Sequence, residues 1–268
     1  MSSYSKAAIC VGINEYPNPA NNLKGCVPDA KLLRKVLLNK YKFDNIDLFT
    51  DKNATYKNVV RAIDNCMLNM KDYGHFVFTV SSHGTTVPDL SGDEEDGRDE
   101  AICLYDRLLV DDTFRKLLDH APVGLRMTII TDCCHSGSIT RAAYVNRFGN
   151  FSRSETYMKP RYLPPEDDNF ALKSNAIPIK SKMFTPEKDM REVLITGCKS
   201  NEYSYDAIYE KSYNGALTYN LVEILKSYTN LTYYQLYKLL QQKLPSSQYP
   251  QTPQLEGSDE NKKRIIFS

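Results

Sequence analysis

Apolar residues along this chain occur in two patterns, as short runs and as longer amphipathic stretches. A short run rich in β-branched residues is typical of a strand that is buried on both faces of a parallel sheet. Leucines and valines spaced three and four positions apart, as in 28–40, are typical of a helix with one buried face. The runs predict strands at 7–13, 45–49, 75–81, 125–132, 192–197 and 264–267, and a short hairpin at 101–105 and 108–110. The stretches predict helices at 28–40, 55–70 (capped by Thr55), 111–120 (capped by Asp111), 214–228 and 232–244.

Strands and helices alternate over most of the chain, which predicts an α/β fold with a mostly parallel sheet covered by helices on both faces. The alternation stops at 141–191, where proline, serine, asparagine and basic residues dominate without periodicity. A long stretch of this kind inside a compact domain is usually functional or disordered. We therefore expect one domain over 1–268, made of a first part (1–140), an inserted loop (141–191) and a second part (192–268).

Composition narrows the functional class. The formal net charge of +1 argues against a general nucleic-acid binder, whose surface would be strongly basic. No apolar stretch is long enough to span a bilayer, and the apolar run at 7–13 is too short for a signal peptide. Seven cysteines without framework spacing suit free thiols in a reducing compartment. We expect a cytoplasmic protein that binds neither nucleic acid nor membranes.

Two polar motifs follow predicted strands. Ser81-Ser82-His83-Gly84 follows the run at 75–80, and Asp132-Cys133-Cys134-His135-Ser136-Gly137 follows the run at 127–131. In an open α/β sheet, residues just past the carboxyl ends of the strands line the functional crevice. A histidine and a cysteine that meet there are the minimum apparatus for nucleophilic catalysis by a thiol.

These motifs resemble the histidine and cysteine motifs of the caspase and metacaspase clan of cysteine peptidases. His83 lies 51 residues before Cys134, close to the caspase spacing of about 50 residues. The resemblance extends to the stretches 11–14, 23–30, 99–112 and 251–254. It implies a caspase-like three-layer sandwich in which Cys134 is the nucleophile and His83 the general acid and base. The backbone amides of Gly84 and Cys134 would form the oxyanion hole.

The resemblance also implies a substrate preference. In metacaspases the residues equivalent to Asp29 and Asp132 line the S1 pocket, which holds the side chain before the cleaved bond, and Ser81 and Cys26 would be its walls. Two carboxylates in a narrow pocket repel each other, and a substrate arginine or lysine relieves the repulsion by pairing with them. We therefore expect protein or peptide substrates with a basic P1 residue, cut after Arg or Lys and not after Asp.

Metacaspases often need calcium, although the chemistry itself requires no cofactor. By motif, Asp99, Asp111 and Asp112 match three family ligands, while Arg141 stands where a fourth is expected. Replacing a carboxylate by a cation weakens an oxygen site for calcium, so the sequence leaves calcium open, and Arg141 could instead pair with the acids.

The inserted loop occupies the position where family members are cut. It offers the basic residues Arg147, Arg153, Lys159, Lys173, Lys180 and Lys182, so self-processing is expected there without an assignable bond. The resemblance favours a monomer, and we expect no extended N-terminal prodomain for recruitment before the first strand.

Each residue also has a plainer interpretation. Cysteine is commonly a core residue, which is the interpretation for Cys10, Cys66, Cys103 and Cys198 and for Cys133 as the buried neighbour of the nucleophile. His75, His120 and His135 are expected to be structural or surface residues. Zinc binding by 133–135 is disfavoured because adjacent residues do not converge on one ion. The acidic run at 93–96 is as consistent with a solvated surface as with metal binding, and Asp29 and Asp111 could simply serve helix N-termini.

Two other functional classes remain. One is a non-catalytic scaffold with a caspase-like fold, which the intact Cys134 and His83 motifs argue against. The other is a transpeptidase or ligase that uses the same thioester with an amine in place of water.

Overall fold

A computed structural model of the 268-residue chain describes residues 4–88, 98–134, 157–164, 187–209 and 212–268. Six strands form the main sheet in the order β12-β9-β7-β3-β1-β2. Their bounds are Tyr4–Gly12 (β1), Asn45–Thr50 (β2), Met70–Ser81 (β3), Arg126–Asp132 (β7), Glu192–Thr196 (β9) and Gln254–Glu256 (β12). Every pair is parallel except β12 and β9, which are antiparallel.

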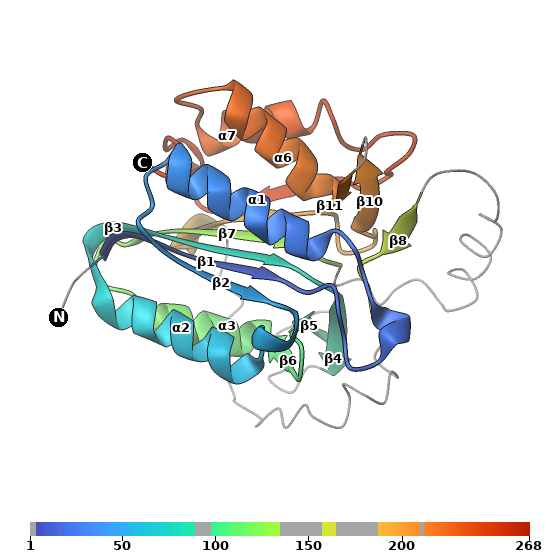
Figure 1. Cartoon of the computed structure of the whole chain (residues 1–268). Helices are drawn as coiled ribbons and strands as arrows, with labels where there is room; N and C mark the ends of the chain where they lie inside the picture. Colours follow the sequence, from blue (N-terminus) through green and yellow to red (C-terminus); the bar gives the residue numbers. More distant parts are fainter. Residues whose placement is uncertain (1–3, 89–97, 135–156, 165–186, 210–211) are drawn as a thin grey trace.

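Helices cover both faces of this sheet (Figure 1). Helices α1 (Cys26–Asn39), α6 (Ala216–Ser227) and α7 (Tyr233–Leu240) lie on one face, and α2 (Tyr56–Asn69) and α3 (Asp111–Asp119) lie on the other. Successive strand residues point to opposite faces: Phe76 and Phe78 pack with the α2 and α3 side, whereas Val77 packs with the α1, α6 and α7 side. This three-layer arrangement confirms the predicted fold class.

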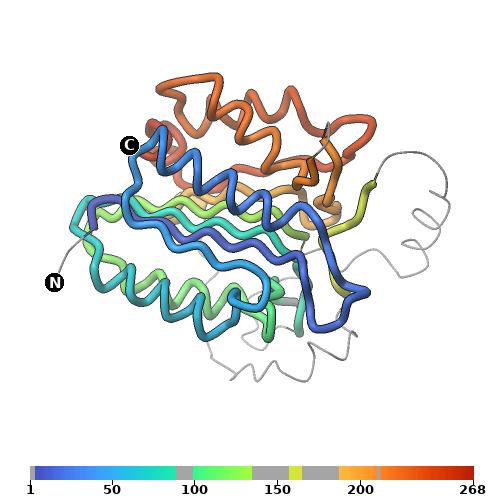
Figure 2. The backbone as a smooth tube through the Cα atoms, in the orientation of Figure 1, coloured from blue at the N-terminus to red at the C-terminus, as the bar shows by residue number. Residues whose placement is uncertain are grey.

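Two small antiparallel sheets stand at the carboxyl ends of the parallel strands (Figure 1). One contains β4 (Gly84–Pro88), β5 (Arg98–Cys103) and β6 (Leu108–Val110), and so includes the predicted hairpin. The other contains β8 (Met158–Pro160), β10 (Tyr205–Tyr209) and β11 (Ser212–Gly215). Strand β8 lies within the predicted loop, in the segment 157–164 drawn in yellow in Figure 2.

Two sequence predictions are wrong in detail. The predicted last strand at 264–267 forms only an isolated bridge between Thr232 and Ile265, after helix α8 (Asp259–Lys262). Ile266 and Phe267 are apolar because they fill the core beside α7, not because they extend the sheet. Helix α3 begins at Asp111 and has Val110 as its N-cap, so Asp111 is not the cap. Thr55 does cap α2, accepting a hydrogen bond from Asn58.

Three short 3₁₀ turns complete the described elements, at Pro19–Asn21, Asp51–Asn53 and Glu187–Asp189. Across the described ranges, no helix combines the length and apolar character needed to cross a membrane.

Candidate active site

The two sequence motifs meet because the strands that carry them are neighbours. Strands β3 and β7 pair in parallel with Ser81 opposite Asp132, so the residues that follow each strand emerge side by side. His83 and Cys134 are both buried, with 1% and 0% of their surface exposed. Cys133 faces the other way, into the apolar cluster with α2 and α3, as expected for a buried neighbour.

The imidazole of His83 is oriented by groups that sequence reasoning missed. Its Nε2 lies 2.7 Å from the backbone carbonyl oxygen of Asn21. Because a carbonyl only accepts, Nε2 carries the proton, and Nδ1 is the basic nitrogen of the neutral ring. The Tyr16 ring packs against the imidazole at a centroid distance of 5.2 Å, and its hydroxyl accepts from the His83 amide. Asn21 contributes its backbone carbonyl, so the identity of its side chain could not indicate this contact in the sequence.

The amides expected to form the oxyanion hole point at one oxygen atom. Gly84 and Cys134 both donate to the backbone carbonyl of Arg161, over 3.0 and 3.1 Å. The Arg161 amide donates in turn to the carbonyl of Ser204, over 2.9 Å. The Cys134 Sγ also lies beside Ser204 and accepts a hydrogen bond from its backbone amide at 2.6 Å. The Arg161 carbonyl oxygen therefore accepts from both amides that the resemblance assigns to the oxyanion hole.

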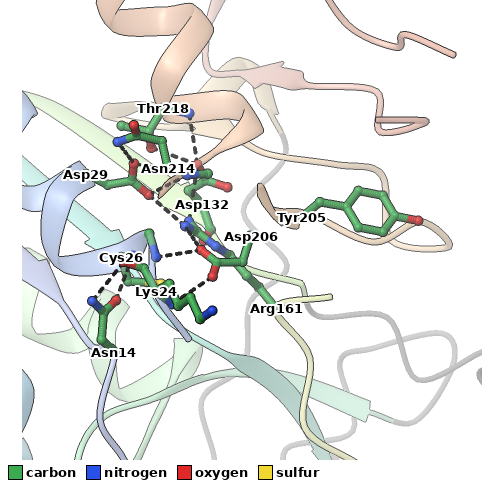
Figure 3. A network of polar contacts seen from close by, with 12 residues as sticks. Asn14, Lys24, Cys26, Asp29, Asp132, Arg161, Tyr205, Asp206, Asn214 and Thr218 are labelled. Atoms are coloured by element: carbon green, nitrogen blue, oxygen red, sulfur yellow. Dashed lines mark hydrogen bonds and ion pairs between the residues drawn. The ribbon is translucent and has the colours of Figure 1, made fainter. Parts of the chain in front are cut away.

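The side chain of Arg161 is fully buried among three carboxylates (Figure 3). Its Nη2 lies 2.8 Å from Asp29 and 2.9 Å from Asp206, and its Nη1 lies 3.4 Å from Asp132. Asp29 and Asp132 were the two expected pocket acids. Neither Arg161 nor Asp206 was singled out from the sequence, because both stand in stretches without a recognisable motif.

Two of these acids are held by groups on the second part of the chain. Asp29 accepts hydrogen bonds from the Gly215 amide and the Asn214 side chain. Asp132 accepts from the Thr218 amide at 2.9 Å and from its hydroxyl at 2.7 Å. A Cβ on Gly215 would come within 2.1 Å of an Asp132 oxygen, so only glycine fits where the backbone closes the pocket.

Asp206 is oriented by the chain just before α1. It accepts from the amides of Lys24 and Gly25, over 2.8 and 2.9 Å, and its Oδ2 accepts from the Tyr157 hydroxyl. The three acids are thus oriented by backbone and side-chain donors as well as by the guanidinium.

Burial and the neighbouring charges together set the pKa values in this cluster. It raises the pKa of Asp29 to about 7, while the guanidinium of Arg161 opposes that rise. Burial alone would lower the pKa of Arg161, but the surrounding acids and Cys26 raise it well above its ordinary value. Burial also raises the pKa of the Cys26 thiol, which interacts electrostatically with Arg161. Cys26, at the start of α1, and Ser81, opposite Asp132 in the sheet, both border the acids.

The residues before Arg161 run as a strand across the site. Strand β8 is antiparallel to β10, with Pro160 opposite Tyr205 and Lys159 opposite Asp206. Lys159 donates to the carbonyls of Ala20 and Asn22, over 2.9 and 2.8 Å. Lys159 is the one described residue among the six expected processing candidates, and it lies two positions before the residue in the pocket.

The expected calcium ligands gather near α3. Asp111 and Asp112 begin that helix and Asp99 lies on β5; burial raises the pKa of Asp111 to about 7, and neighbouring carboxylates add to the rise. Such a cluster suits a cation in charge, but in the described part of the chain no three His, Cys, Asp or Glu side chains converge as a metal site. The described residues alone therefore do not complete a calcium site.

Several expectations fall on residues outside the described ranges: Arg141, the processing candidates other than Lys159, His135 and the acidic run at 93–96. The core cysteines Cys10, Cys66, Cys103 and Cys198 are buried, as expected, and none of the four forms a disulfide. Cys198 lies against the thiol of Cys134, a contact that raises the pKa of Cys198 together with burial. His75 is buried against Thr128, and His120 is exposed on the surface.

The sequence of this chain is similar to those of known proteins. The sequence model of the caspase domain matches residues 5–264. Metacaspase-1 of Cryptococcus neoformans is 27% identical over 300 residues, covering 98% of this chain and 64% of that protein. Metacaspase-4 of Arabidopsis thaliana is 40% identical over 144 residues, covering 50% of this chain and 34% of that protein. The chain thus spans less than two thirds of either relative.

A solved structure gives the same picture of the fold. The crystal structure of a protein from Geobacter sulfurreducens matches with a TM-score of 0.75 and 25% sequence identity, and the match covers 98% of each chain.

Proposed function

The chain belongs to the caspase domain family, and we propose that it is a cysteine endopeptidase that cleaves peptide bonds after arginine or lysine. The position of Arg161 carries the proposal. Its guanidinium pairs with three buried carboxylates while its carbonyl oxygen accepts from the two amides of the oxyanion hole. One residue thus supports both the proposed specificity and the proposed site of cleavage, at the bond that follows it.

The chemistry needs only groups of this chain. His83 Nδ1 takes the proton of the Cys134 thiol, and the thiolate attacks the carbonyl carbon of the bond to be cut. The negative oxygen of the tetrahedral intermediate is stabilised by the Gly84 and Cys134 amides. The C–N bond then breaks, the amine leaves with the proton from His83, and a thioester remains. Water, deprotonated by His83, hydrolyses the thioester to a carboxylate and restores the thiol.

The pocket favours a guanidinium for electrostatic reasons. Two nitrogens of Arg161 reach the three carboxylates, an arrangement that a planar fork of donors satisfies better than one ammonium group. We therefore expect Arg to be preferred over Lys. A substrate Asp would add a buried negative charge beside three carboxylates.

The proposal includes self-processing at the bond between Arg161 and Tyr162. The proposal is supported by the Arg161 carbonyl oxygen, which accepts from the Gly84 and Cys134 amides, and by its side chain, which is buried among the carboxylates of the proposed pocket. The segment 157–164 would therefore block the enzyme until it is cut or displaced. Stimulation by calcium, a monomeric state and a cytoplasmic location remain parts of the proposal that rest on the resemblance and on the acidic cluster.

Paired fluorogenic peptides with Arg or Asp before the cleaved bond test the proposal. We expect turnover of the Arg peptide that is lost in Cys134→Ala and kept in Cys10→Ala, a control at another buried, free cysteine. Mass spectrometry of the wild-type chain should find a fragment that starts at Tyr162, absent in Cys134→Ala. An added amine nucleophile separates hydrolysis from transpeptidation. Retained turnover in Cys134→Ala, or equal cleavage after Asp, would exclude the proposed mechanism or pocket.

A further inference from the structure

We propose that the active site also recognises the two residues after the cleaved bond, selecting an aromatic side chain at the first position and an aliphatic one at the second. The inference rests on the proposed function, because it takes Tyr162 and Leu163 as the residues that follow the cleaved bond.

The backbone contacts couple this region to catalysis through Gly84. The Gly84 amide donates to the Arg161 carbonyl, and the Gly84 carbonyl accepts from the Leu163 amide, each over 3.0 Å. Gly84 also forms a parallel bridge with Tyr162. The residue that supplies one donor of the oxyanion hole is therefore itself positioned by the second residue after the bond. A substrate that docks there orients the Gly84 amide for the developing negative charge.

The first of these side chains packs against an aromatic ring. Tyr162 is 8% exposed, and its ring lies 5.8 Å from that of Tyr203 in a tilted arrangement. Tyr203 directly precedes Ser204, whose carbonyl accepts from the Arg161 amide. Both rings belong to the apolar cluster that contains Cys134. An aromatic side chain at this position adds ring contact beside the nucleophile.

The second side chain enters the main core. Leu163 is 5% exposed and joins the apolar cluster between the sheet and helices α2 and α3. Pro164 is exposed again, so in the described segment the buried footprint ends two residues after the bond. A carboxylate at the second position would lose its hydration with no partner provided, whereas an aliphatic side chain gains from burial.

Burial of Tyr162 and Leu163 has an alternative cause, which is that they only anchor the chain's own loop. Separate peptides added to the enzyme test this alternative, because they are not covalently joined to the chain and so are not anchored by its core. The series uses quenched-fluorescence peptides built on Met-Lys-Pro-Arg-Tyr-Leu, with Leu changed to Met or Asp, Tyr changed to Asp, and Arg changed to Asp. Because the same wild-type enzyme cuts every peptide, competition from its own segment cancels in the ratios of kcat/KM.

We expect Leu→Met to be nearly neutral, and Leu→Asp or Tyr→Asp to lower kcat/KM by about tenfold or more. Equal rates, within about twofold, for the Leu, Met and Asp peptides would overturn the inference and leave the proposed function intact. No cleavage of any Arg peptide, or equal cleavage of the peptide with Asp in place of Arg, would instead overturn the proposed function.

An enzyme variant adds a second arm. Tyr203→Ala should reduce the preference for Tyr over Asp at the first position without changing the preference for Arg before the bond. The matched control is Tyr234→Ala, on the exposed side of α7. A Tyr203→Ala enzyme that discriminates Tyr from Asp as well as the wild type does would remove Tyr203 from the site.

Discussion

Replacing Arg161 by Gln should show that its guanidinium is the counter-ion of a built anionic pocket. The substitution removes a fully buried cation from Asp29, Asp132 and Asp206, at 2.8, 3.4 and 2.9 Å. Breaking a buried ion pair at one partner costs about 3–5 kcal/mol, because the remaining charge is left uncompensated. That is a large share of a typical unfolding free energy of about 5–15 kcal/mol. At about 2–4 °C per kcal/mol for a chain of this size, Tm should fall by on the order of 10 °C.

The loss should depend on pH in a defined direction. The pKa of Asp29 is about 7 with Arg161 present, and removal of the cation raises it further. A carboxyl whose folded pKa exceeds its unfolded value binds more protons in the folded state, so the stability of the variant rises as pH falls. The deficit relative to wild type should therefore be largest near pH 8 and shrink towards pH 5.

Urea unfolding at several pH values measures this deficit. Both proteins should carry Cys134→Ala, so that self-cleavage does not divide the chain during the measurement. Arg115→Gln is the control, since Arg115 is 40% exposed and pairs with Glu192 at 3.4 Å, a contact worth about 0–1 kcal/mol. A loss at Arg161 below about 1 kcal/mol, or a loss of several kcal/mol that is the same at pH 5 and pH 8, would refute the reasoning.

Three further predictions concern ionisable groups. The pKa of Asp29 is about 7 beside Arg161 and lies higher once Arg161 has left the pocket, so kcat/KM for Arg peptides should rise as pH increases above about 7. Asp29→Asn should lower kcat/KM and remove that limb of the profile, and an unchanged limb would assign it elsewhere. If calcium acts through the acidic cluster, Asp111→Asn should abolish any loss of activity caused by a chelator, whereas a variant that stays sensitive would place calcium elsewhere. Burial lowers the pKa of His75 to about 4, so the unfolded chain binds more protons through this group between about pH 6.5 and 4. In urea unfolding, the stability of wild type relative to His75→Phe should therefore fall by roughly 3 kcal/mol over that range, because the other titrating groups are common to both proteins; a difference that does not change with pH would contradict the assignment.

Much of the fold follows from local pattern. The apolar runs correspond to strands β1, β2, β3, β7 and β9, and the amphipathic stretches to helices α1, α2, α3, α6 and α7. Burial on both faces produces a continuous apolar run, and burial on one face produces a helical period, so both patterns are visible without knowledge of any partner. Strands β4, β10 and β11 lack such a pattern, because they are short and their pairing depends on distant segments.

The predicted strand at 264–267 shows the limit of pattern in the other direction. Ile266 and Phe267 are buried, so the apolar signal was correct, but they fill a gap beside Tyr233 of α7. An apolar pattern in the sequence indicates that a residue is buried. It does not indicate which segment of the backbone packs against that residue. The sheet instead ends at β12, where Gln254 pairs with Thr196.

For the candidate site, the sequence by itself determined the nucleophile motif, the histidine motif and their common edge, because parallel strands deliver their carboxyl ends to one side of a sheet. It also pointed to Asp29 and Asp132 through motif resemblance. Only the tertiary structure decided what surrounds them. Asp206 comes from a strand more than seventy positions after Asp132, and Arg161 comes from a stretch without periodicity. A buried arginine among acids arises from long-range backbone pairing, which leaves no local signature in the chain.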